Sequence, residues 1–155
     1  GSGWVLAPDQ GNGLGERLAA AFQDAFKHGA RRAAAIGTDS PWLHPEDIGA
    51  ACDALADADV VIGPAEDGGY YLIGLSRPAP ALFAGIAWGS PQVCAQTQDR
   101  ARAMGLRVRL LRMGYDLDRH EDVMRFIADE RRRGPVPEAV QAMEIHSRGR
   151  ERCPS

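Results

Sequence analysis

The segment richest in reactive residue types is GPAEDGGYYLIGL, which runs from Gly63 to Leu75. Two adjacent acids, Glu66 and Asp67, meet a glycine pair directly before YYLIGL, a stretch dominated by residues that favour strands. A tight turn needs only one glycine and one Asp or Asn. The additional acids and glycines therefore make this segment the first candidate for a functional site.

A second candidate is Asp39, which follows an apolar run and lies between Gly37 and Pro41. A carboxylate at the end of a strand can hold a hard divalent cation. Mg²⁺ takes oxygen ligands, commonly one or two carboxylates together with the phosphates of a substrate. The alternative is that Asp39 only opens the turn formed by Ser40 and Pro41. The spacing alone leaves both interpretations open.

Asp116 and Asp118 form a third candidate. One interpretation makes one of them the second metal carboxylate, opposite Asp39. The other makes Asp118 the N-cap of a helix, with Glu121 completing a capping box, and leaves Asp116 as a solvated loop residue. Both interpretations can hold at once, because an acid can cap with one oxygen and bind a metal with the other.

The remaining patterns exclude several kinds of site. GNGLGERL at 11–18 has glycines at 11, 13 and 15, which is not the spacing of a dinucleotide-binding turn, and no strand precedes it. A nicotinamide-dependent oxidoreductase is therefore not expected. Scattered histidines and cysteines without a C-x-x-C pair indicate reduced thiols in a cytoplasmic protein, rather than disulfides or a zinc site. These residues are His28, His44, His120 and His146, with Cys52, Cys94 and Cys153.

The composition is that of an ordinary globular domain. The chain has 155 residues, of which 45% are hydrophobic and 25% charged. Its net charge of −3 offers no general attraction to nucleic acid or to an anionic membrane. No apolar run approaches the ~20 residues that a membrane span needs. We expect residues 1–3 to be a tag remnant, 4–137 a single domain and 138–155 a flexible tail.

Helices and strands must position these candidates, and their signals alternate along the chain. Helical spacing predicts helices over 18–28, 45–55 and 91–104, and a fourth from about 118. Ser90 and Pro91 are expected to cap and open the third helix. Strands are predicted within 31–39, 58–63, 70–75 and 106–113.

This alternation indicates a largely parallel α/β sheet with helices on both faces. Such a sheet binds ligands at the carboxyl ends of its strands. All the acidic candidates fall just beyond predicted strands, so we expect them to meet at one edge of the sheet although they lie far apart in the sequence.

Four segments in this order resemble a known family: GTDSP at 37–41, GPAEDGGYYLIGL at 63–75, WGSPQV at 88–93 and DLDRHED at 116–122. The family consists of small bacterial GT-A-like proteins of the domain of unknown function 2064 type. The resemblance covers most of residues 10–130. It implies the three-layer α/β fold of nucleotide-diphospho-sugar transferases, whose members include nucleotidyltransferases that attach GMP to cofactor precursors.

The resemblance also implies a role for each candidate residue. Asp39 becomes a ligand of Mg²⁺ or Mn²⁺, and Asp116 or Asp118 becomes its partner. Asp67 or Glu66 orients or deprotonates an acceptor. The residues expected to bind substrate are Gly68, Gly69, Tyr70 and Trp88.

One departure from the family pattern is visible. The family begins with a strand and a loop, rich in glycine and basic residues, that grips the phosphates of a nucleotide, and this sequence has no such segment. We therefore expect either a metal-dependent glycosyltransferase or nucleotidyltransferase, acting on a nucleotide-sugar or nucleotide and a small acceptor, or a non-catalytic module without a donor site. The strand that ends at Asp39 would lack a neighbour, so we also expect a homo-oligomer.

Overall fold

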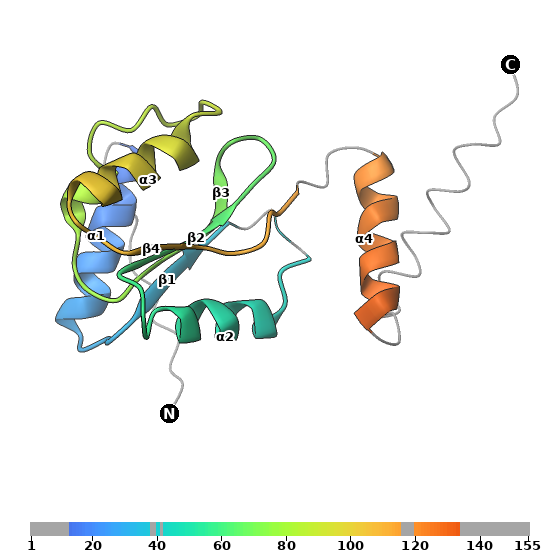
Figure 1. The fold of residues 1–155 in the computed structure, drawn as a ribbon, viewed down its shortest axis with the longest axis horizontal. Coiled ribbons are helices and arrows are strands. Elements are labelled where there is room, and N and C mark those ends of the chain that lie inside the picture. The colour runs from blue at the N-terminus through green and yellow to red at the C-terminus, as the bar shows by residue number, and fades with distance from the viewer. Residues whose placement is uncertain (1–12, 38–39, 41, 116–119, 134–155) are drawn as a thin grey trace, which may run out of the picture.

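The computed structural model describes residues 13–37, 40, 42–115 and 120–133 (Figure 1). The expected tag remnant, the tail at 138–155 and three of the candidate acids, Asp39, Asp116 and Asp118, lie outside these residues. The described helices are α1 (Leu14–Lys27), α2 (Pro45–Ala54), the short 3-10 helix η1 (Pro80–Phe83), α3 (Val93–Ala103) and α4 (His120–Arg133). The described strands are β1 (Ala33–Ile36), β2 (Val60–Pro64), β3 (Tyr70–Leu75) and β4 (Val108–Leu110).

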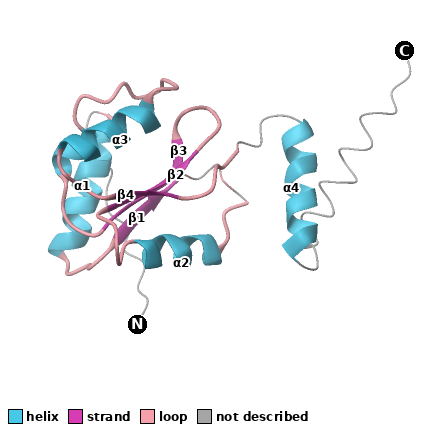
Figure 2. Ribbon diagram, viewed as in Figure 1, coloured by secondary structure: helices cyan, strands magenta, loops and turns pink. Residues whose placement is uncertain are grey.

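The strands form one mixed sheet in the order β1-β3-β2-β4 (Figure 2). β3 is antiparallel to both of its neighbours, while β2 and β4 are parallel. The expectation of a largely parallel sheet is therefore wrong for β3. The physical reason is the connection between β2 and β3, since residues 65–69 are too few for a crossover and long enough only for a hairpin.

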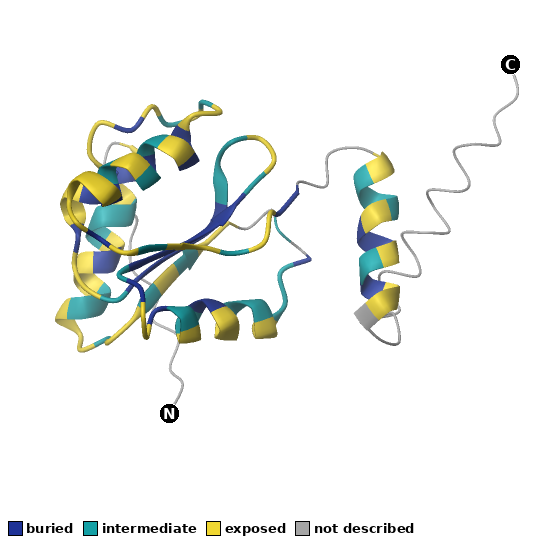
Figure 3. Ribbon diagram, viewed as in Figure 1, coloured by how far each residue is buried: buried dark blue, intermediate teal, exposed yellow. Residues whose placement is uncertain are grey.

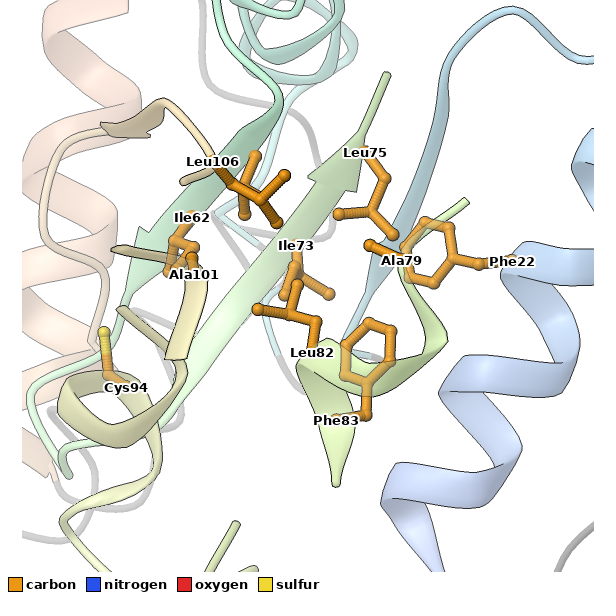
Figure 4. Packing of buried hydrophobic residues seen from close by; sticks show 11 residues of the cluster. Phe22, Ile62, Ile73, Leu75, Ala79, Leu82, Phe83, Cys94, Ala101 and Leu106 are labelled. Atoms are coloured by element: carbon orange, nitrogen blue, oxygen red, sulfur yellow. The ribbon is translucent and has the colours of Figure 1, made fainter. Parts of the chain in front are cut away.

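Two apolar layers cover the two faces of the sheet, as expected from the alternation of helices and strands. Along β2, Val60 and Ile62 belong to one layer and Val61 belongs to the other, and all three are fully buried. The first layer packs against α1, η1 and α3, and Figure 4 shows its side chains packed against β2 and β3. The second layer receives residues of α2 and α4. Figures 1 and 3 show α1 and α3 on one side of the sheet and α2 on the other.

Most predicted elements are present, with four differences in detail. β1 ends at Ile36, before Asp39, and this last residue is 50% exposed. α3 begins at Val93 with Gln92 as its N-cap, so the predicted cap at Ser90 is wrong. β4 is shorter than the predicted stretch, and η1 was not predicted. None of the helices in the described residues is long and apolar enough to cross a membrane.

Candidate functional site

The sheet places three strand ends at one edge. β1 and β2 run in the same direction because both are antiparallel to β3, and β4 is parallel to β2. A hollow of about 470 Å³ lies at this edge. Its lining comes from the segments that follow β1 and β2, from the start of β3, from the segment before α3 and from the first residues of α1 and α3. The lining residues are Leu14, Gly37, Ser40, Ala65, Asp67, Gly69, Tyr70, Tyr71, Trp88, Gly89, Ser90, Pro91 and Val93.

Residues 65–69, which we call the acidic loop, connect β2 to β3 and have a fixed shape. The Ala65 N–H donates to the Gly69 carbonyl at 3.1 Å, and the Gly68 N–H donates to the Ala65 carbonyl at 3.1 Å. Gly68 has a φ of +88°, and a Cβ there would overlap the carbonyl of Pro91. The Gly68 carbonyl accepts the N–H of Cys94 at 2.9 Å, which docks the loop on the start of α3.

The two acids of this loop face different neighbours. Asp67 lines the hollow, is exposed, and accepts the N–H of Gly69 on Oδ1 at 2.8 Å. Glu66 is not among the lining residues. Its carboxylate pairs with Arg125 of α4, with 2.7 Å between Oε1 and Nη1. Of the two acids predicted to be catalytic, only Asp67 is therefore placed to meet a molecule in the hollow.

Tyr70 and Trp88 add an aromatic wall to the hollow. Their rings meet edge to face with 6.3 Å between centroids. The Tyr70 hydroxyl is buried beside that of Thr97, and neither oxygen has another hydrogen-bond partner in the described part of the chain. Burial raises the pKa of Tyr70 well above its ordinary value, so this hydroxyl stays protonated at neutral pH. Tyr70 therefore offers the site a ring surface rather than an acid or base.

A second aromatic group, Trp42 with Tyr71 and Tyr115, was missed by the sequence analysis. The Trp42 Nε1–H donates to the Tyr115 carbonyl at 2.6 Å, and the two rings stack at 5.5 Å. The Tyr71 ring meets Trp42 edge to face at 4.6 Å. Trp42 comes shortly after Asp39 in the sequence, and Tyr115 directly precedes Asp116. Large aromatic residues beside otherwise polar loops were the signal that could have revealed this contact.

No metal centre is formed by the described residues themselves. Within 13–37, 40, 42–115 and 120–133, no group of three or more His, Cys, Asp or Glu side chains could hold a metal ion. The predicted ligands Asp39, Asp116 and Asp118 lie outside those ranges. Residues close to these acids in the sequence are described. Ser40 lines the hollow, and Trp42 donates a hydrogen bond to Tyr115.

The fold and the hollow define an α/β protein with its candidate site at the carboxyl edge of a mixed sheet. A solved structure from Desulfovibrio desulfuricans G20, described as a "putative nucleotide-diphospho-sugar transferase", has the same fold. The TM-score is 0.69 and the sequence identity 39%, over 72% of this chain and 49% of that chain. The expected likeness to nucleotide-diphospho-sugar transferases is thus confirmed for the fold.

Residues 1–90 match the family described as "Uncharacterized protein conserved in bacteria (DUF2064)", and the chain belongs to this family. Two curated relatives carry a more specific name, phosphoenolpyruvate guanylyltransferase. That of Chloroflexus aggregans is 33% identical over 135 residues, which are 84% of this chain and 64% of that protein. That of Sphaerobacter thermophilus is 31% identical over 125 residues, which are 78% of this chain and 58% of that protein. The chain therefore spans less than two thirds of either relative's length.

Proposed function

We propose that this chain has metal-dependent nucleotidyltransferase activity, with the acceptor bound in the hollow beside the acidic loop. The observation that carries the proposal is the placement of Asp67. Its carboxylate is exposed, is held by the N–H of Gly69, and lines a hollow at the edge where ligands bind to sheets of this kind. The names of the two curated relatives support a nucleotidyl group as the group transferred.

The reaction is a displacement at phosphorus. An oxygen of the acceptor attacks the α-phosphorus of a nucleoside triphosphate, and the bond to the bridging oxygen breaks as pyrophosphate leaves. Where the attacking oxygen belongs to a hydroxyl, Asp67 takes up its proton. Where it belongs to a phosphate, as in phosphoenolpyruvate, the oxygen is already deprotonated and no general base is needed, so the role of Asp67 is confined to hydroxyl acceptors.

A divalent cation belongs to this proposal. Asp39 follows β1, and Asp116 and Asp118 follow β4. These strands run in the same direction, and the hydrogen bond from Trp42 to Tyr115 joins the segments that flank the acids. Asp39 with Asp116 or Asp118 would hold Mg²⁺ or Mn²⁺, which neutralises charge on the departing diphosphate.

A glycosyltransferase is the second candidate function. An aromatic wall next to a carboxylate suits a sugar ring, because the ring packs on the aromatic face and its hydroxyls donate to the acid. Trp88, Tyr70 and Asp67 supply these groups in the hollow. The description of the similar solved structure as a sugar transferase favours the same reaction. In this case the donor is a nucleoside-diphosphate sugar, and the products include a nucleoside diphosphate rather than pyrophosphate.

The test is a product assay with paired donors. The chain is incubated with Mn²⁺ and phosphoenolpyruvate or a panel of hydroxyl acceptors, and either with nucleoside triphosphates or with nucleotide sugars. We expect pyrophosphate from the triphosphates. The variant Asp67→Asn should lose about tenfold or more in kcat/KM for a hydroxyl acceptor, while its thermal unfolding stays unchanged.

The other outcomes of this assay would each support one of the alternative functions or remove Asp67 from the mechanism. Nucleoside diphosphate from a nucleotide sugar would establish the glycosyltransferase instead. An Asp67→Asn variant with full activity on every acceptor would remove Asp67 from the mechanism. If neither donor reacts and neither binds in a calorimetric titration, the chain is the non-catalytic module and the proposed function is wrong.

A further inference from the structure

Glu66 and Arg125 link the acidic loop to α4, although they lie far apart in the sequence. The carboxylate and the guanidinium are 2.7 Å apart, and about half of each side chain is exposed. An isolated ion pair at this exposure contributes little to stability. The ion pair can position the acidic loop only if other contacts also hold the side chain of Arg125 and the backbone of Glu66.

Arg125 is fixed by an aromatic surface. Its guanidinium carbon lies 4.1 Å from the centre of the Tyr115 ring, and Tyr115 is buried. The Tyr115 hydroxyl donates to Asp129, one turn further along α4, at 2.9 Å. The cation–π contact and this hydrogen bond limit the positions open to Arg125, so less freedom is lost when it pairs with Glu66.

Glu66 is fixed through its backbone as well. Its N–H donates to the carbonyl of Gly114 at 3.1 Å, and the Gly114 N–H in turn donates to the carbonyl of Pro64 at 2.7 Å. The backbone of Glu66 is thus held by the segment after β4, and its side chain is held by α4.

Asp67 and Gly68 follow Glu66 in the acidic loop, and Asp67 lines the hollow. Gly68 is held from the other side, by the N–H of Cys94 at the start of α3. Asp67 therefore lies between two anchored residues, one tied to α4 and the other to α3. Its backbone has few conformations left, and the direction of its carboxylate depends on both anchors.

We propose that Glu66 and Arg125 are positioning residues, which place Asp67 in the hollow and make α4 a part of the site. Neither residue lines the hollow itself. The effect on turnover rests on the proposed function. The effect on the acidic loop does not, and it can be measured on the chain without substrate.

The first experiment is hydrogen exchange of the acidic loop, read by mass spectrometry on peptides that span residues 63–71. In Arg125→Gln we expect exchange of the loop amides to rise by about fivefold, the upper end of what an exposed ion pair such as Glu66–Arg125 contributes. Arg125→Lys keeps the charge above Tyr115 and should stay within about twofold of the wild type.

Arg132→Gln is the matched control on the same helix. Arg132 is exposed and pairs with Oδ1 of Asp129 at 2.9 Å, whereas the Tyr115 hydroxyl donates to Oδ2 of that residue. We expect no change in loop exchange for this variant. Peptides from β2 report on the core. Faster exchange in these peptides would indicate a global loss of stability, whereas faster exchange in the loop peptides alone would indicate a local release of the loop.

The second experiment separates positioning from simple destabilisation by kinetics. A variant that is partly unfolded has less active protein, which lowers the apparent kcat and leaves KM unchanged. A misplaced Asp67 would also lose its hydrogen bond to the acceptor hydroxyl in the ground state, so Arg125→Gln should raise the KM of a hydroxyl acceptor while the KM of the donor stays the same. Equal loop exchange in wild type, Arg125→Gln and Arg132→Gln would overturn the inference. Absence of turnover in the wild type would overturn the proposed function alone, and loop exchange would still decide the link.

Discussion

Gly68 is the residue at which the backbone of the acidic loop is most constrained. Its φ of +88° lies in the left-handed region, and the carbonyl of Pro91 occupies the space where a Cβ would be. Gly69 has no positive φ, and a Cβ there would meet only the Asp67 carboxylate, at 3.2 Å from Oδ1. Different constraints therefore act on the two adjacent glycines. The backbone conformation and the Pro91 carbonyl exclude a side chain at Gly68, whereas the Asp67 carboxylate crowds one at Gly69.

We predict that Gly68→Ala lowers the free energy of unfolding by about 2–4 kcal/mol, because it combines a left-handed backbone with a steric overlap. Gly49→Ala is the control. Gly49 lies within α2, has no positive φ, and has no atom within 4 Å of an added Cβ, so alanine there should stabilise the chain by about 1 kcal/mol. Urea unfolding of both variants measures the difference. A Gly68→Ala variant as stable as the wild type would show that the loop can change its shape freely.

At the residue level, the acidic loop is visible in the sequence, but the separate roles of its two acids are not. Glu66 and Asp67 have the same chemistry and adjacent positions, and only the fold shows that one meets Arg125 and the other lines the hollow. Trp42 and Tyr115 were missed for a related reason. Their contact joins residues 73 positions apart, and no periodicity within either segment reports it.

At the level of elements, Asp59 joins three strands at the end of the sheet opposite to the hollow. It directly precedes β2, and its carboxylate accepts both the N–H of Arg107 at 2.9 Å and the Nε–H of that residue at 3.2 Å. Arg107 directly precedes β4. The Arg77 guanidinium, just beyond β3, lies 3.3 Å from the same carboxylate. The backbone hydrogen bond from Arg107 is the largest cause that lowers the pKa of Asp59 below its ordinary 3.8.

The pH dependence follows from the direction of this shift. Because the folded pKa is lower than the unfolded one, the charge of Asp59 stabilises the fold at pH values above the unfolded pKa of 3.8. That contribution is lost as the pH falls through the lower, folded pKa. We predict that Asp59→Asn costs about 1 kcal/mol at pH 7, a value reduced for solvent screening. In urea titrations carried out from pH 6 to pH 3, the gap between the two proteins should hold down to the unfolded pKa of 3.8 and narrow below it. A gap that stays constant over this range would contradict the argument.

The elements with clear local signals were predicted well, and those that depend on distant partners were not. α1, α2, β2 and β3 follow from helical spacing, a proline at a helix start and short apolar runs. The end of β1 is set by pairing, since Ile36 is the last residue opposite β3, at Leu72. The position of β3 between β1 and β2 is likewise a property of pairing rather than of any one segment.

For the whole molecule, the α/β fold class could be predicted from the sequence, and so could the sheet edge at which the hollow lies. Strands that alternate with helices imply an α/β sheet, and the family resemblance was confirmed. The reaction could not be predicted to the same depth, because one fold and one hollow suit both a nucleotidyl and a glycosyl donor. Only the groups that a bound donor contacts would distinguish these two reactions.

The edge of the sheet at β1 leads to a prediction about assembly. Within the described part of the chain, β1 pairs with β3 alone, so one side of this apolar strand has no described strand beside it. Ile36, at its end, is 50% exposed. An uncharged apolar edge strand is a template for pairing with a second chain. We therefore predict self-association at low micromolar concentration, through β1 of each copy.

Ile36→Lys should weaken this association by about tenfold or more, because a lysine on an edge strand opposes the approach of a second one. Leu110→Lys is the matched control, since Leu110 lies on β4, the other outer strand, and is similarly exposed at 48%. Light scattering over a concentration series gives the mass of each protein. We expect dimers or larger species for the wild type and Leu110→Lys, and monomers for Ile36→Lys. A wild type that stays monomeric at every concentration would show that β1 does not pair between copies. Loss of association in Leu110→Lys alone would move the contact to the opposite edge of the sheet.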